Sequence, residues 1–206
     1  VDYKSIGFYI IDEQHRFGVR QRLTLKEKSE SNKNFEPHQL MMSATPIPRT
    51  LAMNYFADMD ISIINEMPPG RKSITTKIFA SEKRNQILDT IDQNCLSGNQ
   101  VYWVCPLIEE SETLQLETAE QTFQDLSNYF VNHKVGLIHG RLPSNEKKEI
   151  MEEFKKNKIK IIVATTVIEV GVDVPNATLM VIENAERMGL SQLHQLRGRV
   201  GRGADQ

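Results

Sequence analysis

Residues 135–164 read VGLIHGRLPSNEKKEIMEEFKKNKIKIIVA, and this stretch decides the fold class. It begins and ends with short apolar runs that contain β-branched residues, which predict strands. Between them, Ile150, Met151 and Phe154 form an apolar face opposite lysines and glutamates, as in an amphipathic helix. A strand, a helix and a second strand in this order are typical of a parallel sheet covered by helices on both faces.

The same alternation continues on both sides of this stretch. We expect strands at 75–80, 100–107, 135–139, 160–164 and 179–183, and helices at 82–95, 116–131 and 145–156. The sequence therefore predicts an α/β protein built on parallel sheets flanked by helices.

The first part of the chain predicts a separate, smaller sheet. The apolar run Ile6–Ile11 predicts a buried strand, and Gln39–Met42 predicts a second short strand after a polar surface segment. The run Met67-Pro68-Pro69-Gly70-Arg71 marks a linker, because consecutive prolines cannot continue a helix. We therefore expect one domain at 1–66, a linker at 67–73 and a second domain at 74–206.

Composition describes an ordinary globular chain. The 206 residues are 39% hydrophobic and 25% charged, with a net charge of -2, so any nucleic-acid contact must come from local basic patches. The only cysteines, Cys95 and Cys105, fit neither a metal knuckle nor a disulfide scaffold, and we interpret both as structural residues of a reducing compartment. The most apolar stretch, near 159–174, contains Glu169 and Asp173 and is too short to span a bilayer. We expect a cytoplasmic protein without a membrane partner.

Two acids follow the first predicted strand, in the run Asp12-Glu13-Gln14-His15. Ligands bind at the carboxyl ends of strands in open α/β sheets, so these acids suit a Mg²⁺-nucleotide site. Asp12 would hold the metal, and Glu13 would orient or deprotonate an attacking water. The alternative is that both acids cap the N-terminus of a helix.

Hydroxyl groups follow the second predicted strand, at Ser43 and Thr45, in a proline-containing turn. These side chains would hydrogen-bond the acids of the first strand. The alternative is an ordinary capped helix start.

Three arginines and a carboxamide gather in residues 194–203, HQLRGRVGRG. If this segment is helical, Gln195 and Arg199 lie one turn apart and Arg202 follows at i+3, so that all three project to one side. Planar guanidinium groups suit the oxygens of a polyphosphate whose charge grows in the transition state. The alternative is a basic, solvated helix end.

Polar residues also follow two strands of the second domain. His139 and Arg141 come after one strand and offer backbone amides with a guanidinium. Thr165 and Thr166 follow another strand, where hydroxyls and free amides form a seat for phosphate. The alternatives are a local cap or a surface ion pair at the first position, and helix capping at the second.

The order of these motifs resembles a known family. DEQH at 12–15, SATPIPRT at 43–50, ATTVIEVGVDVPNA at 164–177 and QLRGRVGRG at 195–203 closely resemble superfamily 2 helicase motors, specifically the RecG-type ATP-dependent DNA helicases. The longer runs DEQHRFGVRQR and WVCPLIEESE are similar to the same family. The resemblance implies RecA-like sheets, with one partial lobe followed by a nearly complete second lobe.

The resemblance also implies roles for individual residues, with ATP and Mg²⁺ as cofactors. The catalytic set is Asp12, Glu13, Gln195, Arg199 and Arg202. The nucleotide-binding set is Asp12, His15, Gly171, Asp173, Arg199 and Arg202, with Asp12 as metal ligand. Ser43 and Thr45 would couple the motifs, and the DNA-binding set is His139, Arg141, Thr165 and Thr166.

The activity implied is an ATP-driven motor, acting as a monomer, that unwinds and branch-migrates forked DNA and Holliday junctions. The phosphate-binding pattern GxxxxGKS or GxxxxGKT is absent from the 206 residues, so we expect a motor fragment with little ATPase activity. Two alternatives stay open: the motor of a transcription-repair coupling factor, and an ATP-independent module that binds nucleic acid or protein.

Overall fold

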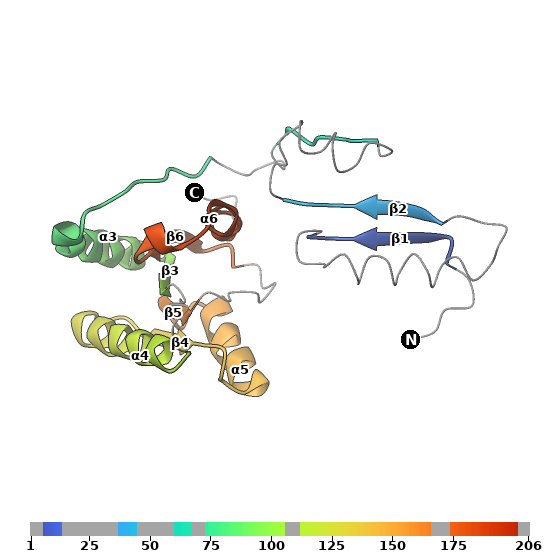
Figure 1. Ribbon diagram of the computed structural model, residues 1–206. Coiled ribbons are helices and arrows are strands. Elements are labelled where there is room, and N and C mark those ends of the chain that lie inside the picture. The colour runs from blue at the N-terminus through green and yellow to red at the C-terminus, as the bar shows by residue number, and fades with distance from the viewer. Residues whose placement is uncertain are drawn as a thin grey trace. The chain divides into compact units, whose positions relative to one another are not determined.

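The chain divides into two compact units, Val1–Ser62 and Ile63–Gln206, which are described separately here (Figure 1). The computed structural model describes residues 6–13, 37–44, 60–66, 73–105, 112–165 and 174–201. His15, Thr45, Thr166, Gly171, Asp173 and Arg202 lie outside the described residues.

The first unit contains a two-stranded parallel sheet of β1 (Phe8–Ile11) and β2 (His38–Met41). Both strands were expected from their apolar runs. The prediction of a buried strand is wrong for part of β1, because Ile11 is buried whereas Phe8 and Ile10 are 54% and 55% exposed. Successive side chains of a strand point to opposite faces, and only the face of Ile11 is covered here.

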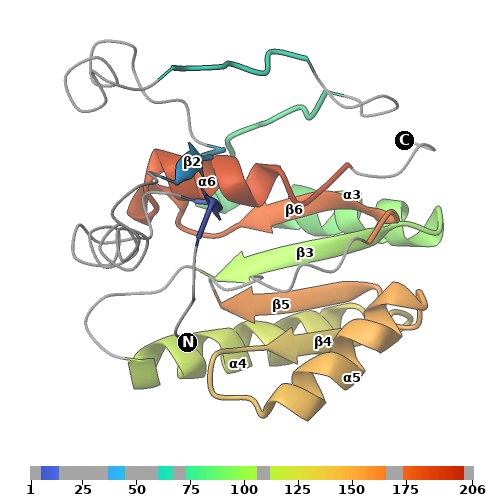
Figure 2. The ribbon, with the colours of Figure 1, turned by 90° about the vertical axis from the view of Figure 1, so that its right-hand side faces the viewer.

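The second unit is built on a four-stranded sheet in the order β4-β5-β3-β6, in which every pairing is parallel (Figure 2). The strands are β3 (Gln100–Cys105), β4 (Val135–Ile138), β5 (Ile161–Thr165) and β6 (Ala177–Ile182). The helices are η2 (Ser81–Lys83), α3 (Arg84–Leu96), α4 (Glu112–Tyr129), α5 (Ser144–Lys155), η3 (Ala185–Arg187) and α6 (Leu190–Arg197). The predicted fold class is confirmed.

Side chains of the central strand β3 alternate between two hydrophobic cores. Val101 and Trp103 point to the core that contains residues of α3 and α4, such as Ile91. Tyr102 and Val104 point to the core that contains residues of α5 and α6. A strand buried on both faces in this way explains why the segment reads as a continuous apolar run.

The apolar stripe predicted for residues 145–156 packs as expected. Met151 and Phe154 of α5 are buried in the second of these cores, and the ring centroids of Phe154 and Tyr102 lie 5.1 Å apart. The amphipathic pattern therefore predicted which side of α5 faces the sheet.

The strand predicted at Thr75–Ala80 is not formed. Residues 73–80 have neither helical nor strand structure, and Ile78 is 98% exposed. Its sequence has high β propensity, but a strand forms only where a neighbouring strand supplies hydrogen bonds and packing.

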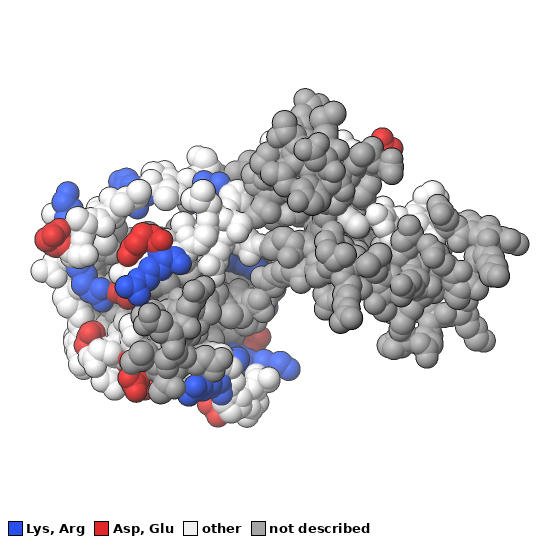
Figure 3. All heavy atoms as spheres, viewed as in Figure 1, with Lys and Arg blue, Asp and Glu red and all other residues white. Residues whose placement is uncertain are grey.

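Lys and Arg side chains alternate with Asp and Glu on the viewed face of the described residues (Figure 3). No single sign of charge dominates there, in keeping with the net charge of -2. None of the described helices is long and apolar enough to cross a membrane.

Candidate functional site

The acids of the first unit stand at the carboxyl end of β1. The carboxylate oxygen Oδ1 of Asp12 accepts a hydrogen bond of 2.8 Å from the backbone amide of Glu13. Glu13 has φ 49°, in the left-handed region that residues with a Cβ rarely adopt. Such a conformation costs about 1 kcal/mol, and strained residues of this kind cluster at functional sites.

Ser43 lies at the same edge of this sheet. The amide of Met42 donates to the carbonyl of Ile11 across 2.8 Å, so the residues that follow β1 and β2 emerge together. This parallel pairing brings Ser43 to the end of the sheet where Asp12 and Glu13 lie. Whether the acids also cap a helix concerns residues outside those described.

The arginine segment departs from the expected helix. Helix α6 ends at Arg197, and Arg199 lies in a turn in which its amide donates to the carbonyl of Leu196 across 2.9 Å. Gly201 then adopts φ 71°. The condition under which Gln195 and Arg199 would share one helical face is therefore not met, because the helix ends before Arg199. Gly198 keeps a right-handed φ of -66°, and the left-handed glycine, Gly201, comes after Arg199.

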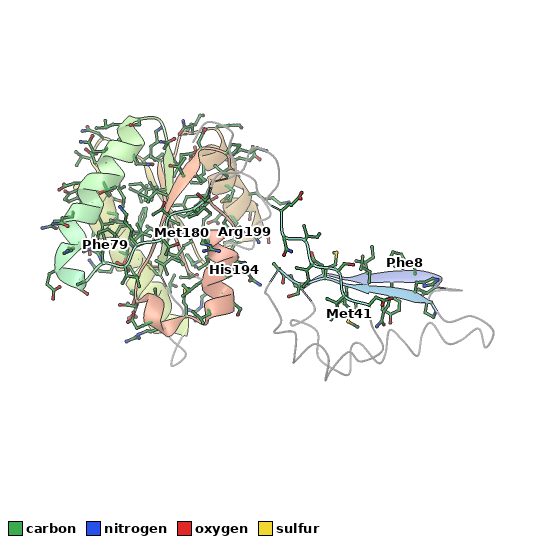
Figure 4. All side chains as sticks on the ribbon, turned by 90° about the horizontal axis from the view of Figure 1, so that it is seen from above. Phe8, Met41, Phe79, Met180, His194 and Arg199 are labelled. Atoms are coloured by element: carbon green, nitrogen blue, oxygen red, sulfur yellow. The ribbon has the colours of Figure 1, made fainter. Side chains whose placement is uncertain are left out.

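The turn that carries Arg199 is fixed from both sides. Leu196 and Val200 are buried in the same core as α5, and the amide of Gly201 donates to the carbonyl of Ala177 across 3.2 Å. Arg199, labelled near Met180 of β6 in Figure 4, is itself partly exposed. A held backbone with a partly exposed guanidinium is suited to binding an anion.

Arg197 differs from Arg199 in its surroundings. It is exposed on α6, and its guanidinium Nη2 lies 3.4 Å from Nδ1 of His194, one turn earlier on the same helix. Its contact is local, and it is not on the turn that carries Arg199.

His139 and Arg141 follow β4. The amide of Leu142 donates to the carbonyl of His139 across 3.2 Å, and Nζ of Lys147 donates to the carbonyl of Gly140 across 2.7 Å. These bonds tie the loop to the first turns of α5.

Folding disfavours the charged form of the His139 imidazole. Burial lowers its pKa below the ordinary value, and the charges of Lys147 and Arg141 lower it further. Its Nδ1 is buried without a hydrogen-bond partner in the described part of the chain. A neutral ring beside exposed Arg141 offers a donor and a charge at one strand end.

Thr165 ends β5 and is 7% exposed, so its side chain is nearly enclosed. Its register partner is Cys105, whose thiol donates to Oε2 of Glu183 across 3.7 Å. Burial raises the pKa of Cys105 to about 12, and the carboxylate of Glu183 adds to the effect. Cys105 is therefore a neutral thiol, in agreement with a structural role.

The candidate groups of the second unit lie at the two opposite ends of the strands. His139 and Thr165 lie at the carboxyl ends of β4 and β5. The turn from Arg199 to Gly201 lies at the amino end of β6, because Gly201 is bonded to Ala177. Because the strands are parallel, these two sets of groups lie at opposite ends of the sheet.

One cluster of side chains was not predicted from the sequence. The guanidinium of Arg84 pairs with the carboxylate of Glu183 and also lies 5.0 Å from the ring centroid of Trp103. Glu183 directly follows β6, the same pattern that singled out Asp12, so the signal was present in the sequence.

The family model "Helicase conserved C-terminal domain" matches residues 82–204, which include β3 to β6 and the arginine turn. The chain belongs to this helicase family.

Curated relatives of this helicase domain confirm the resemblance to RecG-type proteins. The chain is 56% identical over 204 residues to the ATP-dependent DNA helicase RecG of Haemophilus influenzae, covering 98% of the chain and 29% of the relative. It is 54% identical over 202 residues to RecG of Aquifex aeolicus, covering 98% of the chain and 25% of the relative. The chain thus spans less than a third of the length of these proteins.

Comparison with solved structures leads to the same assignment. A structure of RecG bound to a three-way DNA junction has a TM-score of 0.70 at 45% identity, covering 98% of this chain and 25% of that one. The yeast protein Dbp5 bound to RNA has a TM-score of 0.61 at 16% identity, covering 96% of this chain and 50% of that one, and shows the fold alone. Both support the assignment of helicase-type parallel sheets.

Proposed function

We propose that this chain is part of the motor of a RecG-type ATP-dependent DNA helicase, which couples ATP hydrolysis to unwinding and branch migration of forked DNA and Holliday junctions. The observation that carries the proposal is the 56% identity to a RecG helicase across nearly the whole chain. The junction-bound RecG structure supports branched DNA as the partner. The motor would act as a monomer in the cytoplasm.

The acids of the first unit would serve the chemistry. Asp12 is exposed and keeps one carboxylate oxygen beyond the bond to Glu13, which fits a ligand of Mg²⁺, directly or through water. When bound, the ion neutralises phosphate charge. Glu13 would orient the attacking water or accept its proton. His15 would contact the nucleotide beside them.

The arginine turn would complete the site. Arg199 and Arg202 would stabilise the charge that grows on the γ-phosphate, Gln195 would contribute a carboxamide, and Gly171 and Asp173 would lie toward the nucleotide. Such an arginine contributes roughly a thousandfold or more in rate. The arginine turn and the residues proposed to hold DNA lie at opposite ends of the sheet. The second unit would therefore bind ATP and DNA at separate places.

The opposite edge would hold DNA. His139, Arg141, Thr165 and Thr166 would contact the phosphate backbone, which positions the strand without reading its sequence. Ser43 and Thr45 would link the nucleotide acids to motion of the motor. Hydrolysis would release the arginines, and the DNA contacts would then shift in steps.

The test uses the intact parent protein. Forked DNA should stimulate its ATP hydrolysis at least about tenfold, and ATP should drive separation of a labelled three-way junction. ATP-independent binding with no turnover would instead support a simple binding module.

A further inference from the structure

Gln100 is a buried polar residue at the amino end of β3. Its side chain is 0% exposed, and its Nε2 donates to the carbonyls of Phe154 at 2.5 Å and Ile159 at 2.7 Å. Two carbonyl acceptors fix the orientation of the amide, because the flipped amide would turn its own oxygen toward them. This side chain therefore contacts the carboxyl end of α5, where the carbonyl of Phe154 also accepts from the amide of Asn157 across 2.8 Å.

The backbone of Gln100 reaches the arginine turn through β6. Its amide donates to the carbonyl of Asn176 across 2.7 Å, and the next residue, Ala177, accepts the bond from Gly201. The register between β3 and β6 shifts just after Gln100. One residue thus touches both α5 and the short segment to which the turn of Arg199 is tied.

The other end of α5 carries the proposed DNA loop. The helix has 12 residues and is therefore about 18 Å long. Lys147 in its second turn holds the carbonyl of Gly140, between His139 and Arg141. Met151 and Phe154 anchor the helix in the core that also contains Val200.

We propose that Gln100 is a positioning residue that couples the proposed DNA loop of this unit, which contains His139 and Arg141, to its arginine turn. The inference rests on the function proposed above and deepens it by naming how DNA reaches the ATP chemistry. A small displacement of α5 on DNA binding moves the carbonyl of Phe154, and Gln100 transfers that displacement to Asn176 and Ala177. Hydrogen bonds are directional, so a displacement of the Phe154 carbonyl changes the favoured position of the Gln100 amide bonded to it.

The decisive variant is Gln100→Met in the intact parent, because methionine has a similar length and no donor. We expect basal ATP hydrolysis within about twofold of wild type, and the forked-DNA concentration for half-maximal stimulation within about threefold. The maximal rate at saturating forked DNA should fall at least about tenfold. A split between these parameters is not produced by a general loss of stability.

The matched control is Ile91→Ala. Ile91 is fully buried in the core on the other face of the sheet, so this change destabilises the unit without touching the proposed connection. The Ile91→Ala variant should keep the maximal rate of DNA-stimulated ATP hydrolysis at a temperature at which both variants are folded. An equal loss of stimulation in the two variants, or unchanged stimulation in Gln100→Met, would overturn the inference.

A measurement on the wild-type parent keeps the inference testable if Gln100→Met does not fold. Amide hydrogen exchange of Gly201 should change at least about fivefold when forked DNA is added without nucleotide, while amides of α3 stay unchanged. An unchanged rate at Gly201 would contradict the coupling. If wild type shows no DNA-stimulated hydrolysis, the proposed function itself is rejected, which is a different result.

Discussion

The guanidinium of Arg84 and the carboxylate of Glu183 form an ion pair that joins the first residue of α3 to the end of β6. The side chain of Glu183 is 17% exposed and that of Arg84 is 44% exposed, so water screens the pair only in part. The guanidinium of Arg84 also lies 5.0 Å from the ring centroid of Trp103, the only tryptophan in the chain.

Glu183→Gln should therefore lower the free energy of unfolding by about 1 kcal/mol and change the emission of Trp103. Both effects are read from urea denaturation followed by tryptophan fluorescence. The control Glu152→Gln alters the exposed pair with Lys156 and should change neither quantity. Unchanged emission in Glu183→Gln would show that the pair does not shape the surroundings of Trp103.

The 206-residue chain by itself should hydrolyse little ATP, with or without forked DNA, because its sequence contains no GxxxxGKS or GxxxxGKT pattern. Phosphate release measures this directly. Turnover comparable to that of an intact motor, lost in Glu13→Gln, would contradict the expectation.

In the intact parent, Glu13→Gln should slow hydrolysis by about a hundredfold or more while ATP affinity stays within about threefold. The change removes a base or a water-orienting carboxylate and little binding energy. Single-turnover hydrolysis and equilibrium nucleotide binding separate the two effects. A parallel collapse of affinity would assign Glu13 a structural role.

Arg199→Ala and Arg202→Ala in the intact parent should each abolish DNA-stimulated turnover while DNA affinity falls only modestly. Lysine should restore part of the rate, because a point charge lacks the planar fork. Arg197→Ala is the matched control, since Arg197 lies on α6 beside His194. Strong loss of DNA affinity with turnover per bound DNA intact would instead make that arginine a backbone contact.

His139 should make the second unit less stable in acid. Its pKa is lowered by folding, so the unfolded chain takes up a proton first as the pH falls, and stability is lost below the ordinary histidine pKa. Between about pH 7.5 and about pH 5.5, His139→Asn should lose less stability than wild type. Urea denaturation at the two pH values tests this, and equal losses would exclude His139 as the source.

Local sequence patterns predicted most of the helices and strands of the described residues. The apolar stripe of Met151 and Phe154 predicted α5 because helical period is a property of neighbouring residues. Acids, hydroxyls and arginines at strand ends gave the predictions for Glu13 and Arg141 in the same way, and their roles stay predictions.

Partners distant in sequence required the tertiary structure. The strand expected at Thr75–Ala80 depends on a pairing that its own residues do not encode, and β1 is exposed on one face for a related reason. The helical spacing assumed for Arg199 does not apply, because α6 ends at Arg197 and the following turn is bonded to Ala177 of β6, which lies far away in the sequence.

The sequence by itself determined an α/β chain with charged and hydroxyl groups at its strand ends, since both follow from short-range patterns. Only the tertiary structure decided that the turn of Arg199 lies at the opposite end of the sheet from His139, and that Gln100 joins α5 to β6. Those relations depend on strand order and register, which arise from contacts between residues far apart in the chain.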